Sequence, residues 1–152
     1  MKKCTCGSNS VGATLHSSYC DLIAGNSLDG IECLMVAARS NPSETFYFIL
    51  DPLKLPRYAC DRIKSKLGSA VLMSIESAGQ ASITLRNYAE IIIITSADLD
   101  KIRGKKFKGV FIEQQEELSE IKNAVSPALA YNEGSMLVVD PDTREVLSRE
   151  DY

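Results

Sequence analysis

The chain has 152 residues, 45% of them hydrophobic, and a formal net charge of −3. This length and apolar content fit one globular domain with room for at most a small appended module. The slightly acidic balance excludes a globally basic nucleic-acid-binding protein, so any contact with nucleic acid would have to be local. No apolar run approaches the length of a membrane span. Five cysteines, an odd number, occur without an apolar leader, so we expect reduced thiols and a cytoplasmic protein with no membrane partner.

The first predicted unit, residues 1–24, is short and rich in metal-binding residue types. It contains a cysteine-bearing stretch, a turn at residues 7–10 and a helix over 15–24, for which Thr14 is a suitable N-cap. His16 and Cys20 are four residues apart on this helix, so they share a face. Residues 25–30 contain two glycines and predict a linker. The second unit spans residues 31–152.

Strands and helices alternate in the second unit. Two apolar, β-prone stretches predict a pair of strands around a turn, and Pro56 predicts the start of a helix that Gly68 ends. A run of four isoleucines is typical of a strand that is buried on both faces. Pro127 lies just beyond the last predicted helix. The predicted strands cover 31–38, 45–50, 70–75, 82–85, 89–95, 107–112, 135–139 and 145–148, and the predicted helices cover 56–67, 96–102 and 116–125.

This order of elements predicts the fold class. Repeated strand–helix–strand units favour an α/β fold whose strands run partly parallel. We therefore expect a single α/β domain with a mixed, partly parallel sheet flanked by helices, plus a small N-terminal zinc-stabilised element.

The only histidine of the chain lies among three of its five cysteines. Tetrahedral zinc takes four nitrogen and sulfur ligands, and closed structural sites commonly use three cysteines and one histidine. A segment this short cannot bury enough apolar surface to order itself, so a metal ion would supply the missing stability. The alternative is that the cysteines are ordinary core thiols and the histidine a surface residue. The predicted Zn²⁺ ligands are Cys4, Cys6, His16 and Cys20.

The same residues resemble a short N-terminal motif of small bacteriophage proteins. In that motif a C-x-C-G run is followed by H-S-x-(aromatic)-C, and Cys4-Thr5-Cys6-Gly7 and His16-Ser17-Ser18-Tyr19-Cys20 are similar to the two parts. The resemblance covers about the first 20 residues. It implies a phage-encoded protein of the host cytoplasm with zinc at those four positions, and no defined activity for the remainder.

A phosphate-binding loop is a competing interpretation of the same segment. The stretch from Gly7 through Gly12 to Thr14 matches the pattern G-x-x-x-x-G-K-[ST] except that Ala13 stands in place of the lysine. A phosphate would bind there through backbone N–H groups at a helix N-terminus. Without the lysine, the charge that neutralises the outer phosphates is missing.

Residues 91–114 resemble part of the ATPase domain of phage terminase large subunits. In those proteins a Ser-…-Arg-Gly segment precedes a hydrophobic strand that ends in an acidic pair. Here Ser96, Arg103 and Gly104 precede a strand that ends in Glu113-Gln114, so one acid is absent. The resemblance implies a degenerate nucleotide-binding domain that uses Gly7, Gly12, Thr14 and Glu113. The competing interpretation is a buried strand followed by a solvated helix start.

A basic cluster follows the short helix from Ser96. Five cations fall within eight residues, with Gly104 and Phe107 among them, and such a loop suits phosphates or a nucleic-acid backbone. The alternative is a solvated loop. The predicted polyanion-binding residues are Lys101, Arg103, Lys105, Lys106 and Lys108.

Together these patterns favour a small zinc-containing accessory protein that binds a macromolecular partner, either protein or nucleic acid. We expect no catalytic activity, because no histidine outside the N-terminal segment is present to activate Cys33, Cys60 or a serine. The alternative is the degenerate, terminase-like nucleotide-binding domain. The sequence defines neither the oligomeric state nor the identity of the partner.

Elemental analysis tests the metal site. Protein purified without chelator or histidine tag is expected to carry about one zinc per chain, and Cys20→Ser should lose it because one ligand of a closed site is removed. The absence of metal from both proteins would contradict the prediction and favour the phosphate loop.

Overall fold

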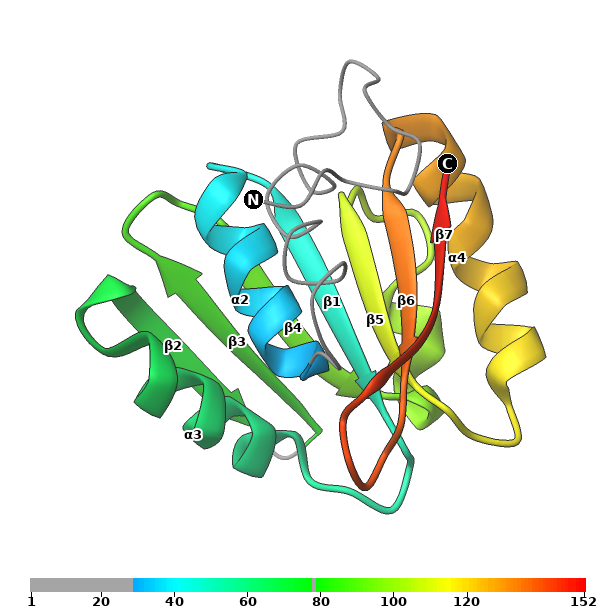
Figure 1. Cartoon of the computed structure of the whole chain (residues 1–152), viewed down its shortest axis with the longest axis horizontal. Helices are drawn as coiled ribbons and strands as arrows, with labels where there is room; N and C mark the ends of the chain where they lie inside the picture. The colour runs from blue at the N-terminus through cyan, green and yellow to red at the C-terminus, as the bar shows by residue number, and fades with distance from the viewer. Residues whose placement is uncertain (1–28, 78) are drawn as a thin grey trace, which may run out of the picture.

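The computed structural model describes residues 29–77 and 79–152 (Figure 1). A seven-stranded sheet with the order β2-β3-β4-β1-β5-β6-β7 forms its centre. Strands β4, β1, β5 and β6 are parallel, whereas β2 and β3 at one edge and β7 at the other run antiparallel to their neighbours. The predicted α/β domain with a mixed, partly parallel sheet is confirmed. The strands are β1 (Thr45–Leu50), β2 (Val71–Ser77), β3 (Gln80–Leu85), β4 (Glu90–Thr95), β5 (Gly109–Glu113), β6 (Ser135–Val139) and β7 (Val146–Asp151).

Helices cover the two faces of the sheet unequally. One apolar core lies between the sheet and helices α2 (Gly30–Ser40) and α3 (Pro56–Leu67). The second core lies on the opposite face, beneath helix α4 (Leu118–Asn132) and residues 99–107. Two short 3₁₀ helices, η1 (Gly68–Ala70) and η2 (Ser96–Lys101), complete the described elements.

The first predicted strand is a helix instead. Residues 31–38 belong to α2, whose amino end is capped by the Asp29 carboxylate, which accepts a hydrogen bond of 2.8 Å from the Ile31 N–H. A short apolar run does not distinguish a buried strand from a buried helix by periodicity. Six of the eight side chains are buried, so the run has no polar face that would reveal the helical period.

The last predicted helix is also longer than expected. Pro127 lies inside α4, which continues to Asn132. Ile121, Val125 and Leu129 are fully buried at a spacing of four residues, so packing on the sheet outweighs the hydrogen bond that proline cannot donate. The helix predicted after Pro56 and the C-terminal hairpin are confirmed.

The connections define a switch point between β1 and β5. These strands are adjacent and parallel, yet β1 leads into α3 on one face while β5 leads into α4 on the other. In open α/β sheets ligands bind in the crevice that forms where the connections diverge, outside the carboxyl ends of the strands. The fold therefore indicates where to look for a site.

The described residues contain neither a candidate membrane-spanning helix nor a candidate metal-binding group. Within 29–77 and 79–152, no helix is long and apolar enough to cross a membrane. Across the same residues there is no group of three or more His, Cys, Asp or Glu side chains that could hold a metal ion.

Chemical labelling checks the environment of two thiols. Cys33 and Cys60 have no exposed surface, and burial, followed by nearby acidic side chains, raises the pKa of Cys33 to about 12 and of Cys60 to about 11. We expect iodoacetamide at neutral pH to leave both unmodified in native protein and to label both in urea, as read by peptide mass spectrometry. Rapid labelling of either in native protein would contradict the packing of α2 or α3.

Candidate functional site

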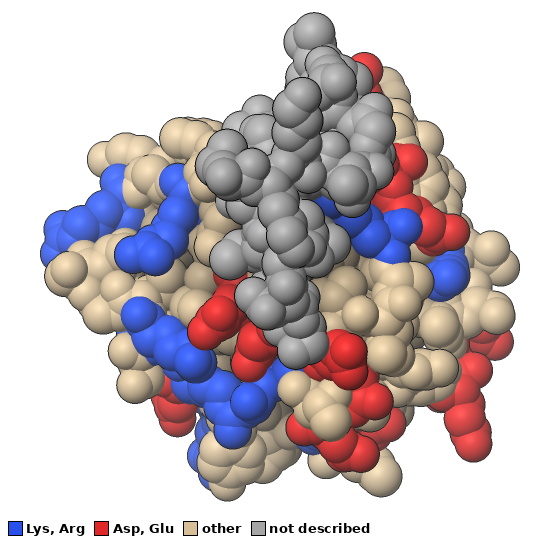
Figure 2. All heavy atoms as spheres, viewed as in Figure 1, with Lys and Arg blue, Asp and Glu red and all other residues tan. Residues whose placement is uncertain are grey.

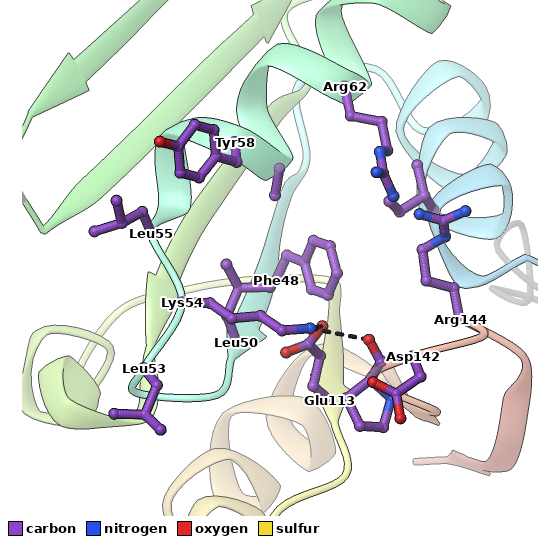
Figure 3. Close-up of a pocket in the computed structure, with 13 residues that line it drawn as sticks. Phe48, Leu50, Leu53, Lys54, Leu55, Tyr58, Arg62, Glu113, Asp142 and Arg144 are labelled. Atoms are coloured by element: carbon purple, nitrogen blue, oxygen red, sulfur yellow. Dashed lines mark hydrogen bonds and ion pairs between the residues drawn. The ribbon is translucent and has the colours of Figure 1, made fainter.

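A pocket of about 550 Å³ lies at the switch point. Its walls come from the end of β1 and the loop after it, from α3, from the end of β5 and from the turn between β6 and β7 (Figure 3). Its position at the carboxyl edge and its size are typical of small-molecule sites. The lining residues are Ile31, Phe48, Leu50, Leu53, Lys54, Leu55, Tyr58, Ala59, Arg62, Glu113, Pro141, Asp142 and Arg144.

An ion pair between Lys54 and Glu113 forms the centre of this pocket. Glu113, the last residue of β5, is buried, and its Oε2 lies 2.7 Å from Lys54 Nζ. Its Oε1 accepts a hydrogen bond of 2.9 Å from the Asp51 N–H, and Lys54 Nζ also donates to the Pro141 carbonyl at 2.9 Å. Both carboxylate oxygens are therefore engaged, and the lysine joins the β1–α3 loop to the β6–β7 turn.

Two further cations line the pocket opposite the lysine. The guanidinium groups of Arg62, from α3, and Arg144, from the β6–β7 turn, lie on the same side of the pocket in Figure 3. Arg144 Nε lies 3.3 Å from an Asp29 carboxylate oxygen. Around α3 the surface is rich in basic side chains (Figure 2). Asp29 pairs with Arg144 and Glu113 with Lys54, which leaves Arg62 and the acidic Asp142 as the other charged side chains of the lining. The Arg62 guanidinium is the cation that an anionic ligand would contact first.

The mouth of the pocket is apolar and aromatic. Phe48 and Leu50 are buried in its floor, whereas Leu53 and Tyr58 are 93% and 62% exposed. Exposed large apolar side chains that border a pocket are typical of a binding site. The arrangement suits a ligand with a flat, partly apolar group next to an anionic one.

The amino end of α2 borders the pocket but is already occupied. Asp29 caps the Ile31 N–H, and the Gly30 N–H donates to the Arg144 carbonyl at 2.6 Å. A side chain at Gly30 would collide with Val139, so this close approach of α2 to β6 requires glycine. An anion at this helix end would have to displace the Asp29 carboxylate, so the side-chain cations are the available anion partners.

The β6–β7 turn is held in shape by Asp140. Its Oδ1 accepts hydrogen bonds from the N–H groups of Asp142 and Thr143 at 2.8 and 2.9 Å. These backbone donors, Thr143 first, lower the pKa of the Asp140 carboxyl below its ordinary value. The turn therefore presents Asp142 and Arg144 to the pocket as part of an organised loop.

The structure places one member of the predicted nucleotide site. Glu113 lies in the pocket, whereas Gly7, Gly12 and Thr14 fall outside the described residues. The predicted zinc ligands, Cys4, Cys6, His16 and Cys20, also lie outside them, so the metal site stays a prediction.

The predicted polyanion cluster is on the other face of the sheet and is divided. Four of its cations, Lys101, Arg103, Lys105 and Lys106, line a hollow of about 600 Å³ beside β4. Lys108 is separate, because its Nζ donates to the Asn132 carbonyl at 3.1 Å and so binds the end of α4. Four of the five predicted cations thus lie together, and polyanion binding by them stays a prediction.

Sequence reasoning missed Lys54, Arg62 and Arg144. Each comes from a different loop or helix, so no local motif groups the three together. The available signal was Asp51-Pro52 after a buried strand, which marks a loop at a strand's carboxyl end. A second G-x-x-x-x-G spacing runs from Gly25 to Gly30, the first residue of α2. It resembles the phosphate-loop pattern, but Ile31 stands in place of the lysine.

No family model matches this sequence, and a comparison with curated proteins likewise finds no match. Among solved structures, the chain is similar to the large terminase ATPase domain of Thermus phage P74-26, with a TM-score of 0.47 and 16% identity over 72% of this chain and 54% of that one. A mutant of the same domain gives a TM-score of 0.45 and 15% identity over 88% of this chain and 64% of that one. The chain thus spans between half and two thirds of these structures. At this level the likeness carries no argument about activity.

Breaking the Lys54–Glu113 pair should destabilise the domain. Lys54→Met leaves the buried Glu113 carboxylate without its cation, which we expect to lower the free energy of unfolding by about 2 kcal/mol, less than for a fully buried pair because Lys54 is 41% exposed. Urea denaturation measures the change. Glu113→Gln added to Lys54→Met should recover part of the loss, since no buried charge remains.

Lys101→Met is the matched control, because its 3.6 Å pair with Asp98 is exposed and should contribute less than about 1 kcal/mol. Equal effects of the two lysine substitutions would contradict the central role of the pocket ion pair.

Proposed function

We propose that this domain binds a phosphorylated small molecule of nucleotide size in the carboxyl-edge pocket and does not hydrolyse it. The observation that carries the proposal is the Lys54–Glu113 pair at the switch point, flanked by Arg62 and Arg144. The proposal keeps the nucleotide-binding alternative from the sequence but assigns phosphate binding to the pocket beside the loop after β1, in place of residues 7–14.

The chemistry of the lining matches both parts of a nucleotide. Arginine and lysine side chains bind phosphate oxygens through charge-assisted hydrogen bonds. Tyr58, Leu53 and Leu55 line the pocket and are exposed. The Arg57 guanidinium lies over the Tyr58 ring at 5.2 Å from its centroid, so the opposite face of the ring offers an apolar surface for a planar base. The volume of about 550 Å³ is in the range of pockets that hold such ligands.

The state of Glu113 argues against hydrolysis. A phosphoryl-transfer site needs a carboxylate that holds magnesium or positions water. Both Glu113 oxygens are bound, one to Lys54 and one to the Asp51 N–H, and the next residue is Gln114 rather than a second acid. The proposal is therefore a binding domain in which a lysine takes the place next to the carboxylate that a metal ion would need.

The N-terminal segment supports a separate proposal. We infer from its spacing alone that Cys4, Cys6, His16 and Cys20 hold a structural zinc ion that orders residues 1–24. A zinc-ordered segment of this kind would suit an accessory protein that binds a macromolecular partner. Nucleotide binding in the pocket would then make that interaction dependent on the ligand.

Nucleotide binding is testable by thermal shift and isothermal titration. ATP and ADP at millimolar concentration should raise the melting temperature, since a ligand that binds the folded state stabilises it, and phosphate release should not exceed the buffer background. Arg62→Ala should weaken binding about fivefold to tenfold through loss of one charged contact.

Lys66→Ala is the matched control, because Lys66 is on the same helix but does not line the pocket. No stabilisation by any nucleotide would contradict the proposal, and magnesium-dependent phosphate release would show that Glu113 can exchange its lysine for a metal ion.

A further inference from the structure

Half of one sheet face has no covering layer in the described structure. On this face Met73, Thr84 and Glu90 are in register across β2, β3 and β4, and so are Ile75, Ser82 and Ile92. Met73 and Ile75 are 50% and 58% exposed. We call the surface formed by Met73, Ile75, Ser82, Thr84 and Ile92 the open face.

The opposite side of the same three strands is covered by a helix. Helix α3 contacts β2, β3 and β4, and Lys64 of α3 hydrogen-bonds to Ser74 and Glu76 at 3.2 and 3.1 Å. Ser74 and Glu76 therefore point to α3, and Met73 and Ile75 point away from it. These three strands pair antiparallel, and antiparallel strands commonly leave one face to solvent. This face, however, carries the exposed apolar side chains of Met73 and Ile75, which the apolar stripe of an amphipathic helix can cover.

A basic wall borders the open face. Lys101, Arg103, Lys105 and Lys106, here called the basic loop, line the hollow whose floor includes Gln80, Ile92 and Ile94. Lys101 Nζ lies 3.6 Å from Asp98 Oδ1, and Arg103 Nε lies 3.4 Å from Asp100 Oδ1. Within the described part of the chain no ion pair engages Lys105 or Lys106. The two lysines are thus available to an acidic partner.

The chemistry of this face favours protein over nucleic acid. Single-stranded nucleic acid binds to sheet faces through exposed aromatic rings on which bases stack. The aromatic side chain that points to this hollow, Tyr47, is only 4% exposed and packs edge-on against Phe107 at 5.2 Å. The exposed side chains of the open face are instead aliphatic and hydroxylic, which suits the apolar stripe of a helix. The exposed Tyr131 lies in a separate hollow beside α4, which Lys105 and Lys106 also line.

We propose that the open face binds an acidic amphipathic helix of a partner protein. Its apolar stripe lies on Met73, Ile75 and Ile92, and its acidic side chains pair with Lys105 and Lys106. This site lies on the opposite side of the sheet from the carboxyl-edge pocket, so it stands independently of the proposed nucleotide binding.

The probe is a labelled synthetic helix of about five turns with leucines on one stripe and glutamates elsewhere, measured by fluorescence anisotropy against the full chain. We expect binding that weakens with salt and is lost when the same residues are scrambled. Lys105→Glu with Lys106→Glu, and separately Met73→Ser with Ile75→Ser, should each weaken it at least tenfold. The charge-reversed variant should instead bind a peptide in which lysines replace the glutamates.

Lys66→Glu on α3 is the control for charge, and circular dichroism verifies that each variant is folded. Absence of binding by folded wild-type protein, or equal binding of the scrambled peptide, would overturn the proposal. Two results would reassign the surface. One is binding of single-stranded DNA that depends on Lys105, Lys106 and the neighbouring Tyr131 but not on Met73 or Ile75. The other is self-association, seen by sedimentation, that the Met73→Ser, Ile75→Ser variant abolishes.

Discussion

The ion pair between Lys54 and Glu113 holds the carboxyl edge of the sheet together. Through one ammonium group, the loop after β1 is joined to the end of β5 and to the β6–β7 turn. Three segments distant in sequence therefore meet at this ion pair. A buried charge needs a partner and further hydrogen bonds to be tolerated, and here the Asp51 N–H supplies one of them. The shape of the pocket depends on this arrangement, because each of its three loops is positioned by it.

The same pair limits what the pocket can do. In a site for phosphoryl transfer an acidic side chain holds a metal ion or positions water, whereas each Glu113 oxygen already accepts a hydrogen bond from the protein. At this residue the structure shows the stabilising contacts. The pocket lining also includes Arg62, Asp142 and the exposed Leu53 and Tyr58.

The elements that the sequence predicts well are those with strong local signals. Pro56 and Gly68 mark both ends of α3, and the four isoleucines of β4 indicate a central strand. The strand predicted for residues 31–38 was wrong because an apolar run without a polar face shows no helical periodicity. The end predicted for α4 was also wrong, because the packing of buried side chains compensates for the one hydrogen bond that Pro127 cannot donate. Glu113 was named because residues 91–114 resemble the part of the terminase ATPase domain in which a strand ends in an acidic pair. Lys54, Arg62 and Arg144 were not, because only the topology brings them together.

The net charge of −3 hides a division of charge that the fold creates. The basic loop and the pocket cations lie on opposite sides of the sheet, so the molecule can present positive surfaces in two directions while remaining acidic overall. Such surfaces act locally, because charges beyond about 10 Å are screened at moderate salt. Binding of a ligand at the carboxyl edge would therefore change the affinity of the open face for a partner only through the strands and loops that connect the two sites. Between those sites lie β1 and β4, which pair in parallel and whose residues are mostly buried. Packing of these strands, rather than charge, is therefore the route by which one site would influence the other.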